Sequence, residues 1–224
     1  MPFKTRLLVV ASCLLCAHAC ASTLTLNCAD AQAGTLNQKA AESRLMAESH
    51  GLAERIAPHV LRVNVAGKAL LFKDIPAAGL DNIAYTFCGS LGGYSLIGWD
   101  DGDEFTGKLI DERTGQILPA GQEVIFSPDG RAYLAIGQED GLDGEDWAVR
   151  YANDGRVSWQ GHSFIVSGNV GAAPLHELSN PRWGESGKLE AEASCRDSPN
   201  AVVGLIKTQG RWSWHVPAGC HPVR

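Results

Sequence analysis

Acidic side chains gather at residues 100–104 and 139–146 and offer the first candidate for chemistry. The later cluster contains Asp140, Asp143, Glu145 and Asp146. Calcium takes about six to eight oxygen ligands around one point, and carboxylates supply such oxygens. The spacing departs from the Asp-x-Asp-x-Asp-Gly loop typical of calcium sites, so a solvated acidic turn is the alternative. We predict a turn without tightly held metal and keep an irregular calcium site at these four residues as a hypothesis.

Tryptophans provide the second candidate. Trp212 and Trp214 are two residues apart on an expected strand, so their side chains share one face of a sheet. With Trp183 and Trp159 they would form an aromatic platform for a glycan or a peptide, which makes Trp183, Trp212 and Trp214 the candidate ligand-binding residues. A buried core face is the alternative role for such a pair.

No catalytic motif can be assigned. Residues 102–108 match the Gly-x4-Gly-Lys pattern of a phosphate loop, but Leu109 stands where Ser or Thr should hold magnesium, and neighbouring carboxylates would repel phosphates. The sequence has no Gly-x-Ser-x-Gly elbow, and its histidines are scattered. We therefore predict no cofactor and no His- or Cys-based metal site. Catalytic residues stay unknown, because a dispersed Ser, His and Asp triad would leave no local pattern.

Four cysteines indicate two disulfides. Cys28, Cys88, Cys195 and Cys220 are the even set that follows the first 21 residues, and an oxidising compartment would pair them. The segment between Cys195 and Cys220 holds two candidate strands that turn near Gly210. Because a hairpin brings its ends together, we predict a Cys195–Cys220 bond, with Cys28–Cys88 as its companion.

The first 21 residues have the layout of a secretory signal peptide. A basic start precedes an apolar run (residues 7–15) and small residues up to Ala21. The apolar run is about half of the ~20 residues that a membrane-spanning helix needs, so we expect no transmembrane segment. Cleavage after Ala21 leaves the even cysteine set. The alternative, cleavage after Ala19, leaves Cys20 as a terminus to which a lipid could be attached. We expect a periplasmic or secreted protein, with lipid anchoring through Cys20 as the alternative.

The charge balance argues against a nucleic-acid partner. The whole chain has 19 Lys and Arg against 25 Asp and Glu, a net charge of −6. Removing the two cations of the leader leaves a net charge of −8, and no basic run remains. An acidic surface repels phosphates, so binding to nucleic acid is not expected. The apolar content of 45% is typical of an ordered globular protein.

The elements that must position these residues are one helix and many short strands. Leu36 to Ile56 has helical periodicity, with a break at Gly51 as an option, and Pro58 ends it. From residue 59 onward, short β-branched and aromatic runs alternate with turn residues, which predicts antiparallel hairpins. The candidate strands are Val60–Val65, Ala69–Phe72, Tyr94–Trp99, Glu104–Asp111, Glu123–Phe126, Ala132–Ile136, Trp147–Tyr151, Arg156–Gln160, Ser163–Val166, Lys188–Ala193, Val202–Lys207 and Trp212–Val216.

A glycine followed by a basic residue recurs along the strand-rich region. It occurs at Gly67, Gly107, Gly130, Gly155, Gly187 and Gly210. Glycine provides the positive φ of tight hairpin turns, so we interpret each pair as a turn followed by a return strand. The domain organisation we predict is a signal peptide (1–21), an N-terminal segment with an amphipathic helix (22–58) and a β domain (59–224).

Two motifs follow one another between residues 93 and 130: Ile-Asp-x-x-Thr-Gly at 110–115 and Ser-Pro-Asp-Gly at 127–130. With these motifs the segment resembles a family of uncharacterised bacterial exported proteins with propeller-like repeats. In that family an acidic-aromatic strand leads to the first motif and then to the second. The resemblance implies a propeller-like fold and an exported location. It carries no catalytic residues that could be transferred.

We therefore expect a mainly β fold, with antiparallel hairpins in a small propeller-like arrangement and one N-terminal α-helix. A β-sandwich is the alternative. The leading functional hypothesis is an exported, non-enzymatic binding or scaffold module for a protein or an envelope polymer. The competing hypothesis is an envelope or extracellular hydrolase with dispersed catalytic residues. A closed pocket that gathers Ser, His and carboxylate groups would favour the hydrolase, and a shallow face without them would favour binding.

Overall fold

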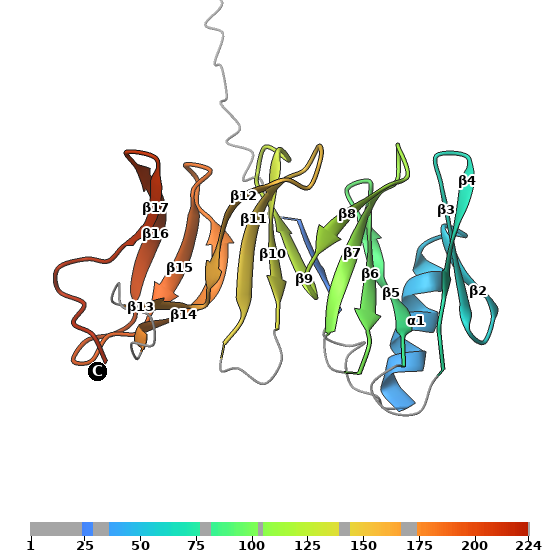
Figure 1. The fold of residues 1–224 in the computed structure, drawn as a ribbon, viewed down its shortest axis with the longest axis horizontal. Helices are drawn as coiled ribbons and strands as arrows, with labels where there is room; N and C mark the ends of the chain where they lie inside the picture. Colours follow the sequence, from blue (N-terminus) through green and yellow to red (C-terminus); the bar gives the residue numbers. More distant parts are fainter. Residues whose placement is uncertain are drawn as a thin grey trace, which may run out of the picture.

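Four antiparallel sheets follow one another in a row in the computed structural model (Figure 1). The structure describes residues 24–28, 36–76, 82–102, 105–138, 144–166 and 174–223. The first sheet contains β2 (Ala53–Ala57), β3 (Val60–Val65) and β4 (Lys68–Lys73). The second contains β5 (Ala84–Leu91), β6 (Tyr94–Asp100), β7 (Phe105–Asp111) and β8 (Gln116–Ala120).

The third and fourth sheets have five strands each. The third contains β1 (Thr25–Asn27), β9 (Glu123–Phe126), β10 (Ala132–Gly137), β11 (Asp146–Tyr151) and β12 (Val157–His162). The fourth contains β13 (Phe164–Val166), β14 (Pro174–Trp183), β15 (Leu189–Ala193), β16 (Ala201–Thr208) and β17 (Arg211–His215). The helix α1 (Leu36–Glu48) lies against β5.

The middle sheets bury both of their faces, because alternate residues of a strand point to opposite sides. In β10, Tyr133 and Ala135 belong to the core between the second and third sheets, whereas Leu134 and Ile136 belong to the core between the third and fourth. A further core lies between the first and second sheets. Burial raises the pKa of Tyr133 to about 12, and its hydroxyl donates to the Pro119 carbonyl at 2.7 Å. Apolar packing between neighbours therefore holds the row together.

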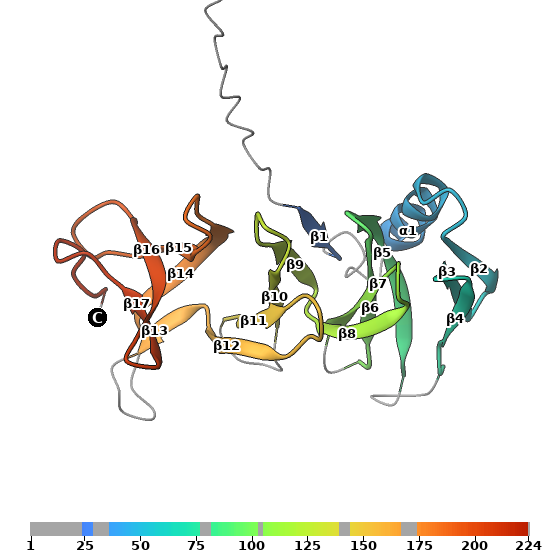
Figure 2. The same ribbon diagram turned by 90° about the horizontal axis from the view of Figure 1, so that it is seen from above.

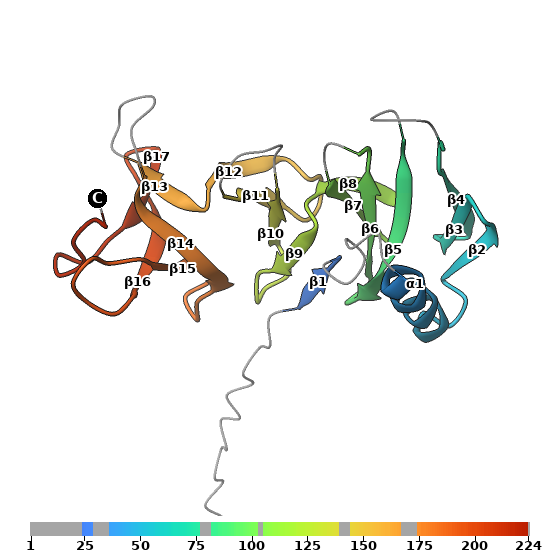
Figure 3. The same ribbon diagram turned by 90° about the horizontal axis from the view of Figure 1, so that it is seen from below.

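The predicted mainly β fold with antiparallel hairpins is confirmed, and the described ranges contain the one predicted helix, α1. The alternative of a β-sandwich has two facing sheets, whereas this chain stacks four. A propeller closes its blades into a ring. Here the first sheet and the fourth sheet lie at opposite ends of the row (Figures 2 and 3).

The predicted helix over 36–56 is too long. Helix α1 ends at Glu48, and His50 and Gly51 both have positive φ. The chain then turns into β2, which pairs with β3 in the first sheet. The apolar residues 52 and 56, which we assigned to helical periodicity, belong to the turn and to the strand.

Five of the six glycine–basic pairs form hairpin turns, as predicted. Their glycines have positive φ at 67, 130, 155, 187 and 210. Figure 1 shows the turns on one side of the row, at the top of the view, and we call this side the turn edge. Gly107 differs because it lies within β7, where a Cβ atom would overlap the backbone of Gly121 in the connection between β8 and β9.

Replacing Gly121 with alanine is expected to destabilise the junction between the second and third sheets. A Cβ atom at Gly121 would overlap the backbone carbonyl of Ile136 in β10, and backbone cannot swing away as a flexible side chain can. Overpacking of this kind typically costs about 1–3 kcal/mol of unfolding free energy, measurable by urea denaturation. Gly204→Ala in β16 is the matched control, because a Cβ atom there meets open space. Equal effects of the two substitutions would contradict the close approach.

Candidate functional site

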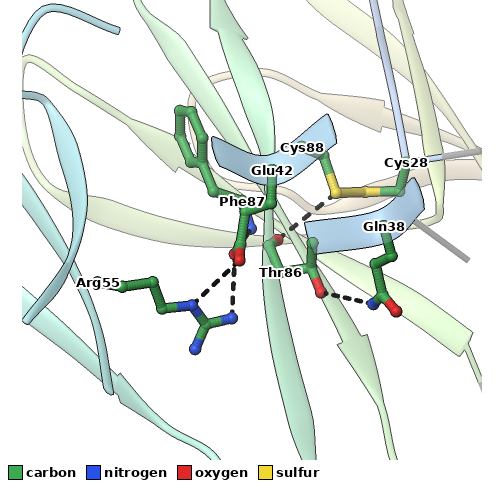
Figure 4. The surroundings of a disulfide bond; sticks show 7 residues. All are labelled: Cys28, Gln38, Glu42, Arg55, Thr86, Phe87 and Cys88. Carbon is green, nitrogen blue, oxygen red and sulfur yellow. Dashed lines mark hydrogen bonds and ion pairs between the residues drawn. A yellow bond between two sulfur atoms is a disulfide. The ribbon is translucent and has the colours of Figure 1, made fainter. Parts of the chain in front are cut away.

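Both predicted disulfides are present. Cys195 bonds to Cys220 across the β16–β17 hairpin, and Cys28, next to β1, bonds to Cys88 in β5 (Figure 4). The bonded cysteines are consistent with folding in an oxidising compartment. The predicted signal peptide and Cys20 lie outside the described residues.

The most buried charged cluster has a structural role. The carboxylate of Glu42 in α1 accepts from the Phe87 backbone N–H at 2.9 Å and from the Arg55 guanidinium at 3.0 Å (Figure 4). Arg55 also donates to Asp74 at 3.0 Å, and Asp74 accepts from the Tyr85 backbone N–H. These groups hold one another and join α1 to the first and second sheets, so we do not assign them to ligand binding.

The tryptophans lie between the third and fourth sheets. The indole N–H of Trp183 donates to the Ile125 carbonyl at 2.9 Å, and that of Trp212 donates to the Ser158 carbonyl at 3.0 Å. Trp214 makes edge contacts with two more tryptophans, at 147 and 159. All three candidates are partly buried against the core, so their placement matches the core-face alternative. We do not carry the aromatic platform further.

The four candidate calcium ligands are not assembled by the described part of the chain. Asp140 and Asp143 lie outside the described residues. Glu145 lines a cleft towards the fourth sheet, whereas Asp146 lies in a smaller pocket with β7 and β8 residues and pairs with His162 Nδ1 at 2.6 Å. Over the described ranges, no group of three or more His, Cys, Asp or Glu side chains is placed to hold a metal ion.

A cleft of about 590 Å³ separates the third sheet from β14, and we call it the carboxylate cleft. It is lined by Glu123, Ile125, Ile136, Glu145, Ser163, Leu178, Ser179, Asn180, Pro181 and Arg182. Glu145 accepts from the Trp147 indole at 3.0 Å. Arg182 pairs with Glu192 at 3.5 Å, outside the cleft. Glu123 in the same cleft is half-buried. Burial raises its pKa, and the charge of Glu145 raises it further.

Glu123→Gln is expected to change the pH dependence of stability. The folded state holds the Glu123 proton more tightly than the unfolded chain does. The contribution of this carboxyl to the stability of the folded state is therefore fully present below its ordinary pKa of 4.5. It is lost as pH rises through the higher pKa that the group has in the folded protein. We expect the variant to have a higher melting temperature than the wild type at neutral pH and the same melting temperature below pH 4.5. A gain of equal size at both pH values would contradict this assignment.

A second groove of about 590 Å³ lies on the turn edge between the second and third sheets, and we call it the turn groove. The β7–β8 turn forms one wall, and the β9–β10 and β11–β12 turns form the other. The lining residues are Tyr94, Asp111, Arg113, Thr114, Gln116, Gly130, Arg131, Tyr151, Ala152 and Asn153. The groove thus combines aromatic, guanidinium, carboxylate and amide groups, the mixture with which proteins fix the orientation of small polar ligands.

One turn geometry repeats around the turn groove. At 111–113, 129–131 and 154–156 the backbone N–H of an arginine donates to the carboxylate of the aspartate two residues earlier, at 2.9, 3.1 and 2.9 Å. Such Asx turns fix the backbone locally. The side chains of Arg113 and Arg131 remain 75% and 87% exposed, so they are accessible to a ligand.

The aspartates of the first two turns stay ionised. Burial raises the pKa of Asp111, but hydrogen bonds from the Arg113 side chain and backbone outweigh burial and lower it. The hydroxyl of Ser127, followed by the Arg131 backbone N–H, lowers the pKa of Asp129. Each turn therefore offers a fixed negative acceptor beside a positive donor.

Two tyrosines complete the turn groove. The Tyr94 ring packs on Phe126 with centroids 4.7 Å apart, and Phe126 in turn contacts Tyr133. Tyr151 is 40% exposed, and the Arg156 guanidinium lies 5.0 Å from its ring centroid. Each ring thus has a neighbour within the protein, Phe126 for Tyr94 and Arg156 for Tyr151.

Sequence reasoning missed this groove and Glu123. The repeated Asp-Gly-Arg at 129–131 and 154–156 was the available signal, and it indicated only turns. That Asp111 and Arg113 form the third copy is visible only once the β7–β8 turn lies beside the others. Glu123 begins a buried strand and has no distinguishing pattern.

No helix in the described ranges is long and apolar enough to cross a membrane.

The comparisons with known proteins identify no relative of this chain. Comparison with protein-family models, with curated proteins and with solved structures gives no match to this chain.

Proposed function

We propose that this chain is an exported, non-enzymatic binding module for an envelope polymer or protein, and that its ligand lies in the turn groove. The observation that supports this most is the set of exposed guanidinium groups and two tyrosine rings around one groove, with the Tyr94 ring packed on Phe126. Preorganised groups lower the entropic cost of binding. The two disulfides fit the exported location.

Neither the turn groove nor the carboxylate cleft offers, among its described lining residues, the Ser–His or Cys–His pairing of many nucleophilic enzymes. Among their described lining residues neither contains His or Cys. Two histidines from the same half of the molecule have other partners: His162 pairs with Asp146, and His176 bonds the Ser194 carbonyl at 2.7 Å. These contacts favour binding over acyl-transfer chemistry.

A hydrolase is the second candidate, and the carboxylate cleft is the feature that favours it. Glu123, whose pKa is raised, faces the same cleft as Glu145. Glycosidases use such a pair, in which one carboxyl stays protonated as the acid while its partner is ionised. In this alternative Glu123 would donate the proton and Glu145 would serve as the base or nucleophile.

Co-sedimentation with insoluble bacterial cell-envelope material separates the two candidates. The oxidised chain lacking residues 1–21 is incubated with the polymer, and the bound protein and the released reducing ends are both measured. We expect the protein to sediment with the polymer, Arg131→Ala to weaken that binding, and no reducing ends to accumulate. Release of reducing ends that Glu123→Gln abolishes would replace the binding proposal with the hydrolase.

A further inference from the structure

We propose that the turn groove binds an uncharged carbohydrate chain, which it would hold between the Asp–Arg pairs of its turns and its two tyrosine rings. This inference rests on the proposed binding function and specifies the ligand class. The argument depends on the charge balance of the groove, on its aromatic surfaces and on its position at the turn edge.

Two guanidinium groups and one carboxylate line the groove, and a second carboxylate, that of Asp129, lies beside the guanidinium of Arg131. Arg113 lies 3.3 Å from the carboxylate of Asp111, and Arg131 lies 3.8 Å from that of Asp129. These ion pairs are exposed on the arginine side, so they contribute little to stability, and each arginine can turn to a ligand. The aspartates keep their backbone hydrogen bonds when it does.

A neutral polyol fits this balance better than a charged polymer does. Sugar hydroxyls both donate and accept, so they can satisfy a carboxylate and a guanidinium at once. An anionic chain would meet the ionised Asp111 and a protein of net charge −6. A cationic peptide would meet the exposed Arg113 and Arg131. The amides of Gln116 and Asn153 also line the groove and provide uncharged donors and acceptors.

The tyrosine rings supply the apolar part of the contact. A sugar ring has an apolar face of C–H groups, and aromatic side chains combine a large apolar surface with a polar end. Tyr94 is half-buried and Tyr151 is 40% exposed, and both line the groove. Tyr94 is held in place by Phe126, so its orientation is set before a ligand arrives.

The position of the groove favours a chain over a single sugar. It lies on the turn edge, where further hairpin turns of the first and fourth sheets continue along the row (Figure 1). Lys68 and Lys188 are exposed on those turns. A polymer could therefore lie along the turn edge and contact successive turns without entering the packed cores between the sheets.

The test is calorimetric titration of the oxidised mature chain with defined probes. The probes are uncharged oligosaccharides of glucose, of xylose and of N-acetylglucosamine, with polygalacturonate and polylysine as charged comparisons. We expect at least one uncharged oligosaccharide to bind with an affinity that is insensitive to salt. Tyr151→Ala and Arg131→Ala should each weaken it by about tenfold or more, because Tyr and Arg commonly dominate binding energy.

Two controls separate loss of binding from loss of folding. Lys73→Ala removes an exposed cation at the end of β4 that lies away from the β3–β4 turn and so away from the turn edge, and Leu71→Ala removes an exposed apolar side chain of the first sheet. Both should bind as the wild type does, and all variants should melt cooperatively. Binding only to polygalacturonate or polylysine, with loss in Arg131→Ala, would overturn the carbohydrate inference and leave the binding function standing. Binding to no probe and to no envelope material would overturn both.

Discussion

Replacing Cys28 and Cys88 together with alanine is expected to lower the free energy of unfolding by about 4 kcal/mol in the chain-entropy model, given a sequence separation of 60. The bond ties β1 to β5 of the second sheet, while β1 itself pairs with β9 of the third. Without it, this strand of three residues loses its covalent link to the second sheet and depends on its pairing with β9 and on non-covalent packing such as that of the buried Leu26. Urea denaturation of the double variant gives the value.

The Cys195→Ala, Cys220→Ala pair is the matched control. That bond has a sequence separation of 25, for which the same model gives about 3.5 kcal/mol. It closes a terminal hairpin and joins no two sheets. We therefore expect the first double variant to lose more stability, and also to expose the core between the second and third sheets to a hydrophobic dye. A smaller loss than in the control would show that β1 does not hold this junction.

Arg55→Met is the second substitution with a large expected effect. Methionine matches the length of the arginine stem but leaves Glu42 and Asp74, with side chains 10% and 14% exposed, without their shared cation. Removing one partner of a buried ion pair costs about 3–5 kcal/mol, and the 21% exposure of Arg55 places this site near the lower value. Thermal or urea denaturation measures the loss.

Arg62→Met in the next strand serves as its control. Arg62 also pairs with a glutamate, Glu54, but both side chains are well exposed, at 37% and 45%. Exposed pairs contribute about 0–1 kcal/mol, so we expect little change. Similar losses in the two variants would mean that the Glu42–Arg55–Asp74 cluster is no more important than a surface pair.

Local patterns predicted the strands that carry their own signal. Val60–Val65 and Glu123–Phe126 match β3 and β9 residue for residue, because each is a β-branched run bounded by turn residues. The disulfide pairing followed from hairpin geometry. The strand β2 was hidden because its residues, Ala-Glu-Arg-Ile-Ala, favour helix, and pairing with β3 overrides that preference. The strand β8 contains Pro119, which is tolerated because β8 is an edge strand.

The candidate site could not be predicted because it belongs to no single segment. Arg113, Arg131 and Tyr151 lie on three hairpin turns from two different sheets. Only the order in which the sheets stack brings these turns together, and that order depends on the inter-sheet packing of apolar residues such as Leu109 and Phe126. The same packing explains why the tryptophans, the most prominent sequence candidates, are taken up between the third and fourth sheets.

The location of the bound ligand tests the central claim most directly. Backbone amide resonances of the isotope-labelled, oxidised mature protein are followed while solubilised envelope polymer is added. We predict that the shifted resonances gather at residues 111–116, 130–131 and 151–153 around the turn groove. Shifts that gather instead at Glu123, Glu145 and residues 178–182 around the carboxylate cleft would contradict the account and favour the hydrolase.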